Sequence, residues 1–142
     1  MQSHKPNFNL LDHTADLGIK VRGTDLKDLF AGAARSMMQI MVKGKTPENT
    51  TSRRLSVSGD DLADLMIRWL GEILYLFDGE KEVVDEVQID FISNSHLDAT
   101  LRVAPFDPEL YEILHEIKAV TYHQIEVAER AHHWEATIIF DL

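Results

Sequence analysis

The stretch DDLADLMIRWLGEILYLFDGE, residues 60–80, decides the fold. Its apolar residues recur every three or four positions, which is the spacing of a helix with one wide apolar face. Asp60 or Asp61 can cap the start of this helix, and Gly79 lies just past its expected end. Such a face is either protein core or a groove for a partner, and core is the more common case. The face comprises Leu62, Leu65, Met66, Trp69, Leu70, Ile73, Leu74 and Phe77.

A second amphipathic helix is predicted within residues 23–42, GTDLKDLFAGAARSMMQIMV. Thr24 is the candidate N-cap, and Asp25 and Asp28 place negative charge near the first turn. Other segments show the two-residue alternation of strands. Strands are predicted at residues 8–11, 17–23, 55–58, 87–91, 97–103, 117–127 and 132–142, with a loop that can hold a short helical turn at 104–116.

These elements predict an α+β fold, a two-layer domain in which the two helices pack on one face of a mostly antiparallel sheet of six or seven strands. The 142 residues suit one domain, so residues 1–142 are expected to fold as a single unit with 1–6 as a flexible tail. Nothing in the sequence demands more than a monomer.

The composition narrows the possible functions. Twenty-four acidic residues against 14 basic ones give a formal charge of -10, which argues against unaided nucleic-acid binding. A basic protein partner or bound cations suit this balance, although the charge can equally serve solubility alone. The chain has no cysteine, no signal-peptide pattern at its start and no apolar run of about 20 residues. We therefore expect a soluble, cytoplasmic protein that is not bound to a membrane.

Four motifs share an order and spacing that resemble those of the archease family over nearly the whole chain. They are DHTADLGIKVRGTDLKDLFAGAARSMMQIM at 12–41, LMIRWLGEILYLFD at 65–78, KAVTYHQIEV at 118–127 and WEATIIFDL at 134–142. The resemblance implies an accessory protein of the RtcB-type RNA ligase of tRNA splicing. It implies that the ligase uses manganese and GTP and forms a histidine–GMP intermediate. The accessory protein promotes this guanylylation and multiple turnover, catalyses no reaction itself, and meets GTP and RNA only through the ligase.

A metal site is expected where both ends of the chain meet. The last strand puts the Asp141 side chain one residue from the terminal carboxylate of Leu142. If Asp16 lies beside them, three carboxylates converge, and a hard cation such as Ca²⁺, Mg²⁺ or Mn²⁺ would relieve their repulsion. The resemblance implies this same ligand set, with calcium as the ion. The alternative is that Asp16 caps a turn and Asp141 lies at a solvated chain end.

Three further residues are candidates for ligase activation or for support of the metal ligands. Asp12 can orient His13 for proton transfer or metal binding, or both can make only local turn contacts. Lys118 can pair with a partner carboxylate, a nucleotide phosphate or the acidic cluster, or it can be an ordinary exposed lysine. Strand alternation places Lys118 and Tyr122 on one face of 117–127 and His123 on the opposite, more apolar face.

Two other functions compete with ligase activation. One is a stand-alone metal-dependent hydrolase that uses Asp12, His13 and Asp16. The other is a general chaperone-like binding module, for which the apolar helix faces would matter more than the carboxylates.

Overall fold

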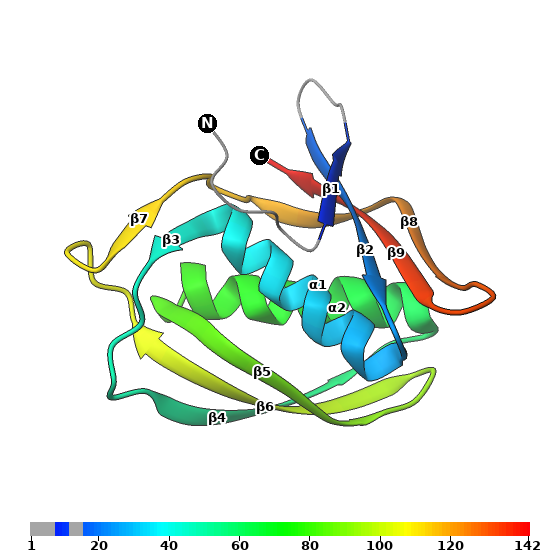
Figure 1. Ribbon diagram of the computed structural model, residues 1–142, viewed down its shortest axis with the longest axis horizontal. Helices are drawn as coiled ribbons and strands as arrows, with labels where there is room; N and C mark the ends of the chain where they lie inside the picture. Colours follow the sequence, from blue (N-terminus) through cyan, green and yellow to red (C-terminus); the bar gives the residue numbers. More distant parts are fainter. Residues whose placement is uncertain (1–7, 12–15) are drawn as a thin grey trace.

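The computed structural model describes residues 8–11 and 16–142, and two helices lie at its centre between two antiparallel sheets (Figure 1). The helices are α1, Leu26–Met41, and α2, Leu62–Asp78. Asp61 caps α2 by accepting a hydrogen bond from the Asp64 amide. In α1 the cap is Asp25, which accepts from the Asp28 amide, so the prediction of Thr24 as the cap was wrong.

The α+β class is confirmed. In place of the predicted single sheet of six or seven strands on one side of the helices, the strands, nine in the described ranges, are divided over three sheets. The four-stranded sheet has the order β1-β2-β9-β8, with β1 Phe8–Leu11, β2 Asp16–Gly23, β9 Trp134–Asp141 and β8 Ala119–Glu129. The three-stranded sheet has the order β4-β6-β5, with β4 Thr51–Ser58, β6 His96–Pro105 and β5 Glu82–Ile92. A small third sheet pairs β3, Val42–Gly44, with β7, Tyr111–Ile113.

One continuous apolar cluster joins both helices to both larger sheets. Ile19 and Val21 of β2 and Leu101 of β6 belong to it, and each is at most 1% exposed. The predicted apolar face of α2 is core: Trp69 is fully buried, and its indole N–H donates to the Phe30 carbonyl of α1 at 2.9 Å. This bond satisfies the one polar atom of the largest buried side chain and fixes the two helices against each other.

Two segments differ from what the sequence predicts. Residues 104–116 were predicted as a loop because of their two prolines, but Tyr111–Ile113 form β7. Gly44 allows the pairing, since a Cβ there would lie 2.3 Å from the Leu110 carbonyl oxygen. In β8 the register to β9 shifts between Thr121 and Glu126, and Gln124 has a φ of 53°.

Neither helix of the described ranges has the length and apolar character needed to cross a bilayer.

Replacing Trp69 by Phe should lower the free energy of unfolding by roughly 1–3 kcal/mol, because it removes the bond to Phe30 and leaves a small void. Trp134→Phe is the matched control, since Trp134 is only partly buried at the rim of the core. Urea unfolding of both variants measures the difference, and an equal effect of the two changes would contradict this role of Trp69.

Two glycine replacements should have opposite effects. At Gly71, within α2, an added Cβ would have no atom within 4 Å, so Gly71→Ala should raise stability by about 0.5–1 kcal/mol through helix propensity. At Gly23 a Cβ would lie 2.4 Å from the Leu29 backbone nitrogen, so Gly23→Ala should destabilise the fold. Thermal melting of both variants checks the two signs, and a stabilised Gly23→Ala variant would contradict the packing at the β2–α1 junction.

Candidate functional site

Asp16 and Asp141 face each other across two neighbouring strands. They are register partners at the end of the β2–β9 pair, although 125 positions separate them in the sequence. Ile19, Val21 and Phe140 point to the core, so strand alternation puts both aspartates on the outer face of the sheet. Directly opposed residues have Cβ atoms about 4.5–5.5 Å apart, which is close enough for two carboxylates to share a cation.

The start of β8 completes this end of the sheet. Ala119 is the register partner of Asp141, and the Lys118 amide donates to the Asp141 carbonyl oxygen at 2.7 Å. Lys118 is exposed, and Leu142 is 36% exposed. The structure thus brings together the backbones of Asp16, Lys118 and Asp141, with Leu142 next in the chain. We call these four residues the acidic end of the sheet.

The other sequence-predicted candidates add no further described ligand. Asp12 and His13 lie outside the described residues. Within residues 8–11 and 16–142, no three His, Cys, Asp or Glu side chains are grouped so that they could hold a metal ion. Asp16 and Asp141 are thus the described acidic pair at this end, and the predicted metal ligation by this pair and the α-carboxylate of Leu142 stays a prediction.

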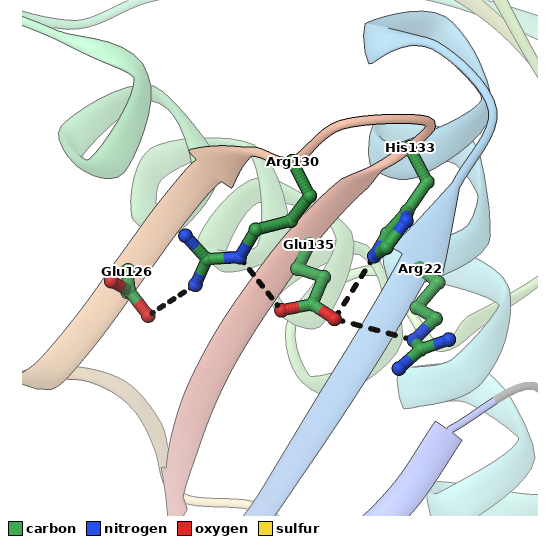
Figure 2. Close-up of polar contacts among 5 residues, drawn as sticks. All are labelled: Arg22, Glu126, Arg130, His133 and Glu135. Atoms are coloured by element: carbon green, nitrogen blue, oxygen red, sulfur yellow. Dashed lines mark hydrogen bonds and ion pairs between the residues drawn. The ribbon is translucent and has the colours of Figure 1, made fainter.

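The opposite end of the same outer face carries a polar cluster centred on Glu135 (Figure 2). Its carboxylate accepts a hydrogen bond from Arg130 at 3.3 Å, forms an ion pair with Arg22 of β2 at 3.3 Å, and contacts the His133 ring Nε2 at 3.0 Å. Arg130 also lies 3.7 Å from Glu126 of β8. We call these five residues the Glu135 cluster. Asp16 and Arg22 are six positions apart along β2, so the two ends are about 20 Å apart.

Glu135 is held in its ionised form. Its side chain is only 12% exposed, yet the hydrogen bond with His133, followed by that from Arg130 and the charge of Arg22, lowers its pKa below the ordinary carboxyl value. The outer face therefore has two distinct ends. At one end two carboxylates face each other, and at the other the Glu135 carboxylate is surrounded by Arg22, Arg130 and His133.

Comparison with known proteins identifies the family of this chain. A model of the archease protein family matches residues 8–142. The chain belongs to the archease family.

Relatives and solved structures agree with this assignment. Protein archease of Methanosarcina barkeri is 30% identical over 146 residues, with both chains fully covered. That of Methanothermobacter thermautotrophicus is 32% identical over 138 residues, covering 95% of this chain and 98% of the relative. The solution structure of Methanobacterium thermoautotrophicum protein 1598 is 30% identical, with a TM-score of 0.78 over 97% of this chain and 100% of that one. A Thermotoga maritima archease, at 18% identity, shares the fold with a TM-score of 0.63 over 100% and 99% of the two chains.

In this archease-family chain, Tyr122 has a contact that the sequence did not predict. Its hydroxyl donates to Asp64 of α2 at 2.7 Å, and Asp64 also accepts from Arg68 at 2.9 Å. The Asp60 amide, the Tyr122 hydroxyl and Arg68 together lower the pKa of Asp64. The bond fastens the irregular part of β8 to the helix. The same irregularity leaves His123 exposed, so its predicted position on the apolar face was wrong.

A serine–histidine–aspartate array also escaped the sequence analysis, because its members come from two strands. Ser58 Oγ lies 2.9 Å from His96 Nδ1, and His96 Nε2 lies 3.0 Å from Asp98 Oδ1. Ser56 donates to the same oxygen at 2.6 Å and, together with His96, lowers the pKa of Asp98. His96 and Asp98 are 37% and 41% exposed, on the outer face of the three-stranded sheet. Polar cross-strand pairing accounts for these contacts.

Glu135→Gln should make stability less dependent on pH. Because the folded-state pKa of Glu135 is lowered, its contribution is complete above the unfolded carboxyl pKa and is lost as the pH falls through the folded value. The variant should melt at a lower temperature than the wild type at pH 7, and the gap should close in acid. Thermal melting from pH 3 to 7 measures this, and a gap that widens in acid would contradict the assignment.

Proposed function

We propose that this chain activates an RtcB-type RNA ligase of tRNA splicing in the cytoplasm, without catalysing a reaction itself. In this proposal it promotes GTP-dependent guanylylation of the ligase and its multiple turnover. The observation that carries the proposal is the pairing of Asp16 with Asp141 in a chain of the archease family. It gives a protein with a formal charge of -10 a localised pair of carboxylates on the outer face of the four-stranded sheet.

The proposed metal site consists of Asp16, Asp141 and the α-carboxylate of Leu142. Carboxylate oxygens are hard donors, and the described ranges offer neither cysteine nor a third grouped histidine or acid, so Ca²⁺, Mg²⁺ or Mn²⁺ fits this set better than zinc. A cation bound there would neutralise the paired carboxylates and could meet the phosphates of GTP. Charge neutralisation and positioning are what nucleotidyl transfer chiefly requires.

Lys118 has the position of an assisting residue. Its amide donates to the Asp141 carbonyl oxygen, so its backbone lies beside that of Asp141, and its side chain is exposed. An ammonium group at this place can bind a phosphate oxygen or a partner carboxylate. We propose that Lys118 orients either the nucleotide or the ligase, while the excess negative charge speeds the encounter with a basic, RNA-binding partner.

The test is ligase guanylylation and multiple-turnover RNA joining, with and without this protein. Asp16→Asn, Asp141→Asn and Lys118→Ala should each lower the stimulation by about tenfold or more, the loss expected when a ligand or its supporting group is removed. Glu72→Gln, at an exposed position on α2, is the charge-matched control and should leave the stimulation intact. Full stimulation by both aspartate variants would contradict the proposal.

A C-terminal extension tests the third donor without changing a side chain. Blocking the Leu142 carboxylate should weaken binding of Ca²⁺ or Mn²⁺ and the stimulation, with an unchanged melting temperature in the absence of metal. Calorimetric titration of the tagged and untagged proteins measures this. A tagged protein with unchanged cation affinity would exclude the terminal carboxylate as a ligand.

Two competing functions have their own signatures. The Thermotoga maritima archease is described as a possible chaperone, and a chaperone-like function would show as suppression of aggregation that persists in Asp16→Asn. A stand-alone hydrolase would turn over nucleotides with divalent ions in the absence of the ligase. Either result, without stimulation of the ligase, would replace the proposed function.

A further inference from the structure

An exposed apolar segment lies next to the acidic end of the sheet. Leu110, Ile113 and Leu114 are 40%, 53% and 43% exposed, and they account for three of the seven large apolar side chains that the described residues expose. They fall within five consecutive positions on and beside β7, at the edge of the molecule (Figure 1). Exposed apolar residues that are gathered together rather than scattered mark surfaces that bind a partner.

The backbone of this segment is held firmly, so its side chains are presented in a fixed arrangement. The Leu114 amide donates to the Met41 carbonyl at 2.8 Å, and the Lys45 amide donates to the Leu110 carbonyl at 3.3 Å. Between them, Tyr111 is only 6% exposed and stacks on Phe106 at 6.0 Å. The exposure of the neighbouring side chains therefore does not come from a loose loop. A surface that is ordered before binding loses less entropy when a partner docks.

The acidic and basic residues within this segment are all of one sign. Every acidic residue from 107 to 116 is exposed, and no lysine or arginine lies in that range. The acidic residues are Asp107, Glu109, Glu112 and Glu116. Two exposed cations lie beside the segment: Lys43, the register partner of Glu112, and Lys45, whose amide donates to the Leu110 carbonyl. We call residues 107–116 the acidic–apolar strip.

The strip leads directly to the proposed metal site. Ile113 and Lys118 are five positions apart in the chain, so the two lie at most about 18 Å from each other. In Figure 1 the chain runs from β7 along the top of the molecule to the start of β8, where the Lys118 amide bonds to Asp141. A partner that contacts the strip and extends along this segment would reach the acidic end of the sheet.

We infer that the acidic–apolar strip is the surface by which this protein docks on a basic protein partner. The partner surface has an apolar hollow that receives Ile113 and Leu114, surrounded by Lys and Arg that face the four acids. The inference rests on the proposed function, since the occupant is then the RtcB-type ligase. The apolar pair contributes most of the binding affinity, and the acidic residues speed association and orient the partner. Docking here would place the acidic end of the sheet against the ligase.

The closing experiment measures binding and stimulation separately. Purified ligase from the same organism is titrated with the full chain and its variants, and guanylylation is assayed in parallel. The double variant Ile113→Ser/Leu114→Ser should raise the Kd by about tenfold or more and lower the stimulation at subsaturating protein. Phe91→Ser, which removes a 50% exposed apolar side chain on β5, is the matched control and should leave both unchanged.

A second variant tests the acidic residues of the docking surface separately from Ile113 and Leu114. Glu112→Lys/Glu116→Lys should slow association, with the effect largest at low salt. The control Glu72→Lys/Glu129→Lys makes the same change in net charge at other exposed positions and should slow association less.

The outcomes separate the two claims. Wild-type affinity and stimulation in both strip variants would overturn the docking surface and leave the proposed function standing. Binding that depends on the strip without any stimulation by the wild type would support the surface and overturn ligase activation. A wild-type protein that neither binds nor stimulates the ligase would overturn both.

Discussion

The antiparallel pairing of β2 with β9 is the constraint on which the rest of the structure depends. It joins the beginning and the end of the chain through eight registered residue pairs, from Asp16 with Asp141 to Gly23 with Trp134. One face of this pair, with Ile19, Val21 and Phe140, closes the core over the two helices. The other face carries the candidate site. A register shift of one residue would exchange these faces, so the core and the acidic end are specified by the same pairing.

The helices make this pairing possible by supplying a surface that both sheets can cover. Trp69 and Phe30 join α2 to α1, and their apolar faces are buried between the four-stranded and three-stranded sheets (Figure 1). The outer faces of the two larger sheets can therefore carry polar and charged side chains. Along the β2–β9 pair, carboxylates gather at one end and the Glu135 cluster at the other (Figure 2). The strip at β7 extends the acidic end, so the metal and partner contacts we propose share one region.

Local features of the sequence were sufficient to predict both helices and most of the strands. The helical spacing of apolar residues and the capping aspartate predicted α2. The α+β fold class followed from the two-residue alternation of the segments before and after it. The cap of α1 was misassigned by one residue because Thr24 and Asp25 are both good caps, and only the geometry selects Asp25. β7 was missed because prolines on its N-terminal side suggested a loop. The position of Gly44 opposite Tyr111 could not be known without the fold.

The candidate site could be predicted only in part, because its contacts join residues that are far apart in the sequence. Asp16 and Asp141 were singled out with the help of the family resemblance, and their cross-strand pairing is a contact that no local pattern contains. Strand alternation failed at His123 because the irregularity in β8 changes which side chains face the core. The bond from Tyr122 to Asp64 and the Ser58–His96–Asp98 array depend likewise on strands and helices that are distant in sequence.

The most direct test of the account is a double-mutant cycle of cation affinity. Ca²⁺ or Mn²⁺ binding is measured by calorimetry for the wild type, Asp16→Asn, Asp141→Asn and the double variant. If the two carboxylates hold one ion, the double variant should bind hardly more weakly than either single variant, because each change alone already breaks the shared site. Losses that simply add, or wild-type affinity in all three variants, would contradict a site built by the β2–β9 register.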